Sequence, residues 1–389
     1  MKFTRIIHPI GQGGFYTETL SRRKEEINIV YDCGGFNGRE NEMNYYLQHY
    51  LQNGKTKKKI EAVFISHFHA DHINGLQYLL ENTEVKYLFL PQLKEDIVME
   101  AFFHNYCMTE KNVQVNHFLT RLYYGETRFP TRIMQIGNAN DHDAYSINPY
   151  IFDNKNISME AWHGRDNKRI DLSSSKLLPS STILHCGKWL YLPFNSWVAP
   201  VRRELIYELE NELQTDVSIR NLSTILETNG VEKCKKIYEK VFKGKHNSYS
   251  MTLFSGLMGF HAHRYYKPRK RCFVSDYGCF SKTHLDCLNP NFLYLGDFEP
   301  QNSIYELERK YAAIWSKVES IQVPHHGSIK NYHRDLYKYP HIGIVSVGIN
   351  NPYHHPDIST IMNIQSQGCQ PIMVTEDENS MKSYCYKIY

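Results

Sequence analysis

Residues 65–75 read ISHFHADHING, and this stretch decides the fold assignment. It follows an apolar run and places His67, His69, Asp71 and His72 within six positions. The first two histidines can face one side of an extended loop and hold one ion, while Asp71 and His72 at a helix start turn toward a second. Zinc, manganese and iron accept imidazole and carboxylate ligands. A polar loop with incidental histidines is the alternative, but four liganding side chains so close together after a buried strand favour a metal site.

Later stretches of the chain offer the ligands that a two-metal site still needs. FLYLGDFEP (292–300) places Asp297 directly after an apolar strand, where a carboxylate can project toward two cations. IQVPHHGSIKNY (321–332) holds His325 and His326 in a tight turn between a proline and a glycine. Such a turn can present one histidine to a metal and the other to a substrate oxyanion or a proton relay. KHNSYSMTLFSG (245–256) offers His246 just before a strand, with other single histidines as competitors.

The composition describes a globular chain without a strong charge bias. The 389 residues are 41% apolar and 13% aromatic, which is enough to bury a substantial core, and the formal net charge is only +4. Global charge therefore does not identify a polyanionic partner. No signal-peptide stretch and no run long enough to cross a bilayer is present, so we expect a soluble, cytoplasmic protein with no membrane association. The nine cysteines are odd in number and lack a C-x-x-C pair, so thiols are expected.

Short strands alternate with helices in the first third of the chain, and short strands return in the last third. Strands are expected at 3–7, 15–20, 27–31, 62–66, 85–89, 251–254, 271–274, 292–295, 321–323, 342–347 and 370–374. Helices are expected at 40–51, 72–80, 94–105, 200–215, 231–242, 303–318 and 358–366. We therefore predict an α/β domain whose N-terminal half is 1–94 and whose C-terminal half is 246–389, with 95–245 as a large, partly helical insertion.

Together these motifs resemble the metallo-β-lactamase superfamily, and most closely its ComEC-like branch, named after the hydrolase domain of a DNA-uptake protein. IGQGGFYTETL (10–20) is similar to the VGQGD start of that branch, and IVYDCGG (29–35) to its LIDxG strand end. SHFHADHING matches the principal metal motif, and HNSYSMTLF resembles the segment HTPGSxxL. LYLGD, VPHHGS and IVSVGINNPYHHPDISTIM (344–362) follow in the family's order.

The resemblance implies a four-layer αββα sandwich with two divalent metal ions at the strand-end rim, Zn²⁺ by preference and Mn²⁺ as the alternative. His67, His69 and His246 would hold one ion, and Asp71, His72 and His326 the other. Asp297 would bridge the two ions, and Asp32 would be a supporting carboxylate. The residues expected to act in catalysis are Asp71, His325 and His355, the last two beside the metals as substrate or proton-transfer groups.

Hydrolysis is the reaction class that such a site implies. Two divalent ions roughly 4 Å apart would bring the pKa of a bridging water near neutrality and supply a hydroxide nucleophile. The choice among phosphodiester, β-lactam, thioester and lactone lies in the walls of the site, which the motif does not describe.

Two basic segments favour a phosphate-containing substrate, so we predict a phosphodiesterase or nuclease acting on nucleic acid or nucleotides. KCKKIYEKVFKGKH (233–246) carries six lysines, and HRYYKPRKRC (263–272) interleaves cations with tyrosines. Cations can neutralise phosphates while tyrosines stack on bases. Either segment alone would by default be interpreted as a solvated helix face or β-hairpin, and it is the presence of both, together with the resemblance, that favours phosphate. The expected substrate-binding residues are Arg264, Tyr265, Tyr266, Lys267, Arg269, Lys270 and Arg271.

Two other functions stay open from the sequence. One is a hydrolase of a small non-nucleotide ester, of the phosphorylcholine or lactone type. The other is a non-catalytic metal-binding component of a larger assembly. Against it, a site that has lost its catalytic activity has no chemical need for a complete ligand set. Protein partners in a multi-component system fit either an enzyme or such a component.

Overall fold

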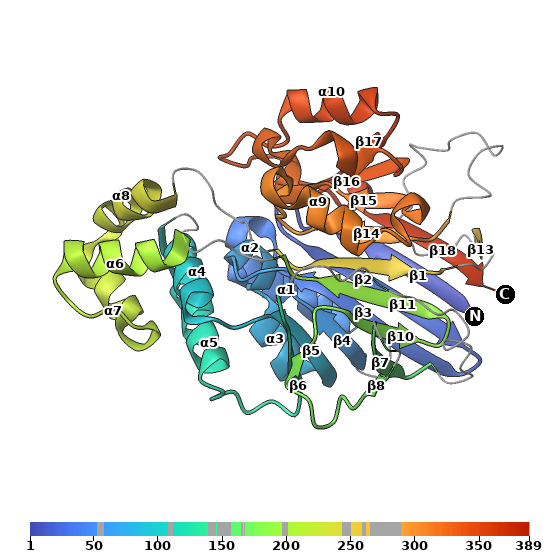
Figure 1. The fold of residues 1–389 in the computed structure, drawn as a ribbon, viewed down its shortest axis with the longest axis horizontal. Coiled ribbons are helices and arrows are strands. Elements are labelled where there is room, and N and C mark those ends of the chain that lie inside the picture. Colours follow the sequence, from blue (N-terminus) through green and yellow to red (C-terminus); the bar gives the residue numbers. More distant parts are fainter. Residues whose placement is uncertain are drawn as a thin grey trace.

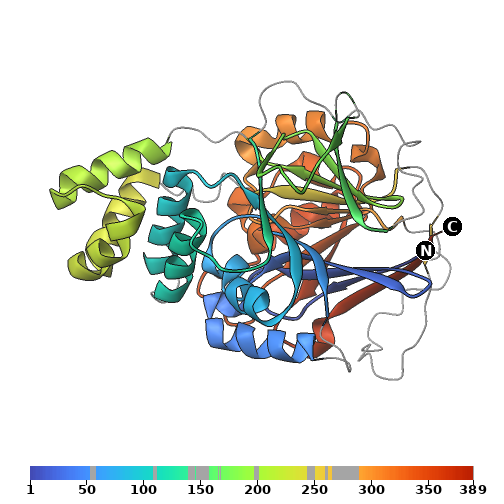
Figure 2. The same cartoon turned by 90° about the horizontal axis from the view of Figure 1, so that it is seen from below.

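The structure, a computed structural model, describes residues 1–52, 58–107, 112–138, 145, 157–164, 166, 168–196, 201–242, 250–258, 262–264 and 289–388. The described strands form two sheets that lie face to face, with helices on both outer sides (Figures 1 and 2). This is the αββα sandwich that the sequence predicts.

The first sheet runs from the chain termini to the metal motif and beyond. In spatial order its strands are β13 (Ala262–Arg264), β18 (Lys382–Ile388), β1 (Lys2–Ile7), β2 (Phe15–Arg22), β3 (Glu25–Cys33), β4 (Ile60–Phe64), β5 (Val85–Pro91), β6 (Arg132–Ile136) and β9 (Leu177–Leu178). From β3 to β9 neighbouring strands are parallel. β1 and β18 pair antiparallel, so the first and last described strands lie side by side.

The second sheet is built from the middle and the last third of the chain. In spatial order its strands are β17 (Gln370–Val374), β16 (Ile342–Ser346), β15 (Ser320–Gln322), β14 (Phe292–Tyr294), β12 (Thr252–Gly256), β11 (Trp189–Phe194), β10 (Thr182–Cys186), β7 (Met159–His163) and β8 (Arg169–Ile170). The strands from β14 to β17 are parallel. Residues 95–245 thus supply strands to both sheets as well as helices, and the three-part division of the chain stays a prediction.

Helices cover the outer faces of the sheets and form a separate group at one end of the sandwich. They are α1 (Glu40–Leu51), α2 (Ala70–Ile73), α3 (Leu76–Asn82), α4 (Glu95–Cys107), α5 (Val113–Tyr123), α6 (Val201–Leu213), α7 (Ile219–Asn229), α8 (Val231–Phe242), α9 (Pro300–Lys310) and α10 (Ile358–Ser366). In Figure 1, α1 and α3 lie along the first sheet, α9 and α10 along the second, and α6–α8 project from the sandwich beside α4 and α5. We call α6–α8 the helical lobe.

Three apolar layers separate the four layers of the sandwich, and strand alternation explains them. In β4, Val63 faces the helices α1 and α3, while Ala62 and Phe64 face the other sheet. The layer between the sheets is rich in aromatic rings, among them Phe89 and Tyr191. Because side chains alternate along a strand, an uninterrupted apolar run is what a strand buried on both faces requires.

Two predicted helices are shorter than expected. The helix expected at 72–80 is broken into α2 and α3, because the amide N of Gly75 donates to the carbonyl of Cys33 (2.9 Å) and α1 packs so closely there that a Cβ would lie 2.7 Å from Met43 and Leu47 side-chain atoms. The helix expected at 303–318 ends with α9 at Lys310. A short 3-10 turn (Trp315–Lys317) follows it.

The remaining short helices are 3-10 turns, and one of them is the predicted histidine turn. They are η1 (Phe36–Gly38), η4 (Pro324–Gly327), η5 (Ile329–Asn331), η6 (Arg334–Tyr337) and η7 (Glu378–Ser380), with the turn at Trp315–Lys317 as η3. The six described cysteines are free thiols. Among the described helices, none combines the length and apolar character that crossing a membrane requires.

Candidate metal centre

The predicted metal ligands that the structure describes lie in one buried cluster at the carboxyl ends of parallel strands. We call these residues the metal cluster: His67, His69, Asp71, His72, Asp297 and His326. The six residues lie in the loops and short helices that follow β4 of the first sheet and β14 and β15 of the second, so the cluster lies where the carboxyl ends of strands from both sheets meet. All six residues are at most 7% exposed, so their charges and lone pairs are largely removed from water.

The metal cluster divides into two groups of candidate ligands. His67, His69 and Asp297 form the first group, and Asp71, His72 and His326 the second. In each group the candidate ligand atoms all lie within 4.8 Å of one another. The sequence-based expectation divides the described histidines and Asp71 in the same way but has Asp297 as a bridge, and the role of these residues as metal ligands stays a prediction.

Asp297 lies between the two groups. Its Oδ2 is 3.7 Å from Nε2 of His67, and its Oδ1 is 3.3 Å from Nε2 of His72 and 3.8 Å from Nε2 of His326. One carboxylate oxygen therefore faces each group, which is the arrangement that a bridging ligand requires.

Hydrogen bonds on the far side of the rings orient two histidines toward the centre. Nδ1 of His72 lies 2.8 Å from Oδ2 of Asp32, and Nδ1 of His326 lies 2.8 Å from the carbonyl oxygen of Ser346. Within the described part of the chain, Nε2 of both rings is buried without a hydrogen bond. A histidine held at one nitrogen by an acceptor presents the other to a metal, so these donor atoms fit a divalent cation.

The local electrostatics also favour a cation. Burial alone would lower the pKa of His72, but Asp297, Asp71 and Asp32 hold it well above its ordinary value. Burial likewise would raise the pKa of Asp71, whereas His72 and His326 keep it well below its usual range. The carboxylates of this buried site therefore stabilise positive charge on the neighbouring imidazoles. They would stabilise a bound cation in the same way.

The motif loop is held in place by an acceptor behind it. Asp32 is fully buried at the end of β3 and accepts from the amide N (2.7 Å) and the hydroxyl (2.8 Å) of Ser66 as well as contacting His72. Gly13 has a φ of 132° and packs against the backbone of Asp71, where a Cβ has no room. Both contacts explain why the GQGG and DCGG stretches accompany the metal motif.

The two histidines expected to act beside the metals line the more open side of the cluster. His325 and His326 have φ values of 47° and 55°, so η4 is the tight turn that the sequence predicts. Nδ1 of His325 lies 2.9 Å from Oδ1 of Asn331, and its Nε2 lies 3.8 Å from Oδ2 of Asp297. The rings of His325 and His355 are 5.5 Å apart. Burial lowers the pKa of His355 to about 4.

Several predicted residues lie outside the described part of the chain. These are His246 and the substrate-binding candidates Tyr265, Tyr266, Lys267, Arg269, Lys270 and Arg271. Arg264 ends β13, but its side chain is not described. The roles of all these residues stay predictions.

Helix α4 contributes side chains to the cluster that the sequence reasoning missed. Oε1 of the fully buried Glu100 lies 3.4 Å from Nε2 of His69, and the ring of His104 stacks on His69 at 3.5 Å. Asn105 accepts from the amide N of Ala70 (2.7 Å). Polar residues four apart in an otherwise apolar helix (EDIVMEAFFHNYC) were the available indication, because such residues are rarely buried without a partner.

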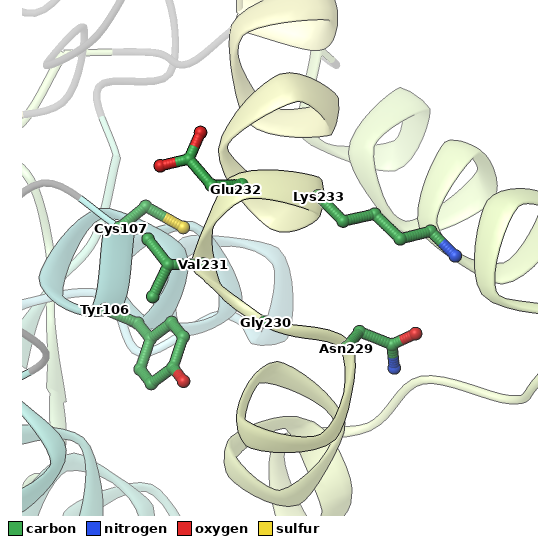
Figure 3. Close-up of a pocket in the computed structure, with 7 residues that line it drawn as sticks. All are labelled: Tyr106, Cys107, Asn229, Gly230, Val231, Glu232 and Lys233. Carbon is green, nitrogen blue, oxygen red and sulfur yellow. The ribbon is translucent and has the colours of Figure 1, made fainter.

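The structure also has a hollow of about 550 Å³ that shares no residue with the metal cluster. It lies at the C-terminal end of α4 against the junction of α7 and α8, and it is lined by Tyr106, Cys107 and residues 229–233 (Figure 3). Burial raises the pKa of the Cys107 thiol to about 12, so this thiol is not an activated nucleophile.

Comparisons with known proteins agree with this architecture. A family model described as metallo-beta-lactamase superfamily matches residues 22–89. Ribonuclease J of Mycoplasma genitalium is 26% identical over 145 residues, which are 35% of this chain and 22% of that protein, so only about a fifth of the relative's length is matched. A crystal structure of unliganded yeast PDE1 aligns over 99% of both chains at 10% identity and a TM-score of 0.39, which is too low to establish a shared fold. The family model, the Ribonuclease J match and the two-sheet sandwich support placing the chain in the metallo-beta-lactamase superfamily.

Proposed function

We propose that this chain is a binuclear metal-dependent hydrolase, a phosphodiesterase or nuclease that acts on nucleic acid or nucleotides. The observation that carries the proposal is the metal cluster, in which two groups of buried imidazoles and carboxylates converge at strand ends of the two sheets. When bound there, two divalent ions would activate water and neutralise charge on the group under attack.

Within this proposal, each described side chain has a defined task. His67, His69 and Asp297 would hold one ion, with His246 completing the set, and Asp71, His72 and His326 would hold the other. Asp32 and the carbonyl of Ser346 keep the rings of the second group oriented.

His325 and His355 would contact the substrate. His325 is oriented by Asn331, and its side chain is 26% exposed, so a bound molecule can reach it. The ring of His355 stands next to it on the same side of the cluster. Both rings can bind an oxygen of the substrate or pass a proton to the leaving group.

Two observations support a phosphate-containing substrate. The match to Ribonuclease J, a protein named for cleavage of RNA, covers part of this chain. The sequence also carries the basic segments 233–246 and 263–272. Cations near a hydrolytic metal site can neutralise the phosphates of a nucleic acid. We further propose, on the sequence alone, a ComEC-like relationship, Zn²⁺ over Mn²⁺, a cytoplasmic location and partners in a multi-component system.

A substrate panel tests the proposal. Metal-loaded protein should cleave DNA, RNA or a cyclic nucleotide, and the activity should fall by on the order of a thousand-fold or more in Asp297→Asn and in His69→Ala, because residues of one catalytic unit do not act independently. Binding of the nucleic acid should weaken steeply as salt rises. A metal-replete protein inert on the whole panel, or one that turns over only small esters independently of salt, would contradict the phosphodiesterase proposal.

A further inference from the structure

Glu100 of α4 occupies a position at the metal cluster for which the metal motif has no counterpart. It is fully buried, and its Oε1 lies 3.4 Å from Nε2 of His69. The same Oε1 accepts a hydrogen bond from the hydroxyl of Tyr238 in α8, at 2.8 Å. A chain of contacts therefore runs from the helical lobe through α4 to a candidate metal ligand.

His69 contacts its protein partner through a different ring nitrogen from the other candidate histidine ligands. His72 and His326 contact their acceptors through Nδ1, and Nδ1 of His67 lies 3.0 Å from the hydroxyl oxygen of Ser66. His69 instead meets Glu100 through Nε2. A carboxylate at one ring nitrogen fixes the tautomer and leaves the opposite nitrogen for the metal.

The His69 ring is also fixed on its face and along its backbone. The His104 ring stacks on it with centroids 3.5 Å apart and planes 8° from parallel. Asn105 holds the adjoining loop from both sides, since it accepts from the amide N of Ala70 (2.7 Å) and donates to the carbonyl of Phe68 (3.1 Å). Helix α4 therefore forms a wall behind the motif loop.

We propose that Glu100 is a positioning residue for His69, and that Tyr238 holds Glu100 in place from the helical lobe. Glu100 keeps the proton of the His69 ring on Nε2 and directs Nδ1 into the first ligand group. The inference rests on the proposed metal site. It gives α4 and the helical lobe a role in metal affinity, apart from any contact of the lobe with substrate.

Zinc affinity of the full chain tests this role. Zn²⁺ alone is titrated into the chelator-stripped protein in competition with a chromogenic chelator, and bound zinc is counted by elemental analysis. Glu100→Ala should weaken one of two zinc sites by roughly 10- to 100-fold, as loss of such an outer partner does. Glu100→Gln, which keeps an acceptor, should restore part of the affinity, and Tyr238→Phe should have a smaller effect in the same direction.

A matched control and the unfolding curves separate positioning from a structural role. Glu18→Gln alters another buried carboxylate between the sheets and should leave both zinc affinities unchanged. Unfolding of each metal-free variant is measured beside the titration. If Glu100→Ala binds zinc like wild type and loses only stability, the inference is wrong. If Glu100→Ala does not fold, zinc affinity and stability are compared in Glu100→Gln and Tyr238→Phe instead, and wild-type zinc affinity in both variants would likewise overturn the inference. A wild-type chain that binds no zinc would overturn the proposed function and this inference together.

Discussion

Two buried polar clusters join the same two sheets, and they are built in opposite ways. One is the metal cluster. The other, which we call the Arg5 cluster, consists of Arg5, Glu18, Trp189, Ser255 and Tyr294, from β1 and β2 of the first sheet and β11, β12 and β14 of the second. Both clusters place charge where water is excluded, yet only the metal cluster brings together side chains of the kinds that bind metal ions.

In the Arg5 cluster, each nitrogen of the guanidinium group donates to an acceptor. Nε donates to Glu18 Oε1 (2.8 Å), Nη1 to the carbonyl of Pro290 (2.8 Å) and Nη2 to Ser255 Oγ (3.3 Å). Glu18 in turn accepts from the hydroxyls of Ser255 and Tyr294, both at 2.8 Å. Burial opposes the charge, but Tyr294 and Glu18 raise the pKa of Arg5 above its ordinary value. The cluster is complete without a ligand.

The metal cluster instead brings together atoms that bind metal ions. Its inward-facing atoms are ring nitrogens and carboxylate oxygens that face one another, as Nε2 of His72 and Oδ1 of Asp297 do at 3.3 Å, while Nδ1 of His72 and of His326 contact Asp32 and Ser346 behind the rings. Carboxylates that converge in a dry space repel one another unless positive charge, from protonated imidazoles or a bound cation, lies among them. The Arg5 cluster uses ligand types that suit only one another, whereas the imidazoles and carboxylates of the metal cluster also suit a bound cation.

Added zinc should therefore produce the largest change in stability, and it should act through the metal cluster alone. At a free Zn²⁺ concentration about a thousand times the dissociation constant of each site, the free energy of unfolding should rise by about 4 kcal/mol per bound ion relative to chelator-treated protein. Urea unfolding with and without zinc measures the rise. His326→Ala should lose much of it, and Glu18→Gln should keep it. An equal rise in a variant that lacks both His67 and His72 would contradict the comparison.

The difference between the clusters also explains what the sequence could predict. The metal cluster depends on short stretches in which ligand types recur within a few residues, such as His67 to His72 or His325 and His326, so composition and order were informative. The Arg5 cluster consists of single residues on separate strands. Nothing in KFTRII distinguishes Arg5 from a solvent-exposed arginine on an edge strand, because its partners lie up to 289 residues away.

The fold was predictable to a similar degree and for similar reasons. Helices α1 and α10 begin and end where their apolar periodicity predicts. Strand β18 was missed although Tyr384, Tyr386 and Ile388 alternate with less apolar residues, the pattern of a strand with one buried face. Strands β7, β10 and β11 were missed although β10 pairs antiparallel with both β7 and β11, and only Gly187 and Lys188 separate β10 from β11. Glu100 was missed because its partners, His69 and Tyr238, are in other elements.

Breaking the Arg5 cluster should have the next largest effect, and it should leave metal binding intact. Glu18→Gln removes the charge that faces the buried guanidinium group, which lies 2.7 Å from Oε1. Leaving one partner of a buried ion pair uncompensated should lower the free energy of unfolding by about 3 kcal/mol. Urea unfolding of the metal-free protein measures this loss. A simultaneous loss of zinc affinity would show that the two clusters are not independent.

His8 should give a smaller, pH-dependent effect on stability, because the hydrogen bonds of this histidine resemble those of the Arg5 cluster rather than those of the metal cluster. Its Nδ1 lies 2.9 Å from the hydroxyl of Tyr46 and its Nε2 lies 2.8 Å from the hydroxyl of Thr17, so both nitrogens have partners. Burial, with a smaller contribution from Lys58, lowers its pKa to about 3. The folded protein therefore holds His8 neutral, whereas the unfolded chain protonates it below about pH 6.5.

The sign of the effect follows from these two values. The stability that neutral His8 contributes is complete above about pH 6.5 and is lost as the pH falls toward 3, with a slope of about 1.4 kcal/mol per pH unit for one proton. The difference in unfolding free energy between wild type and His8→Gln, both metal-free, should therefore shrink from pH 6 to pH 4. Because the metal-cluster histidines titrate equally in both proteins, their contribution cancels. If the difference in unfolding free energy stays constant over this range, His8 is not held neutral in the folded protein. Two hydrogen-bonded nitrogens would then not be enough to identify a histidine as structural.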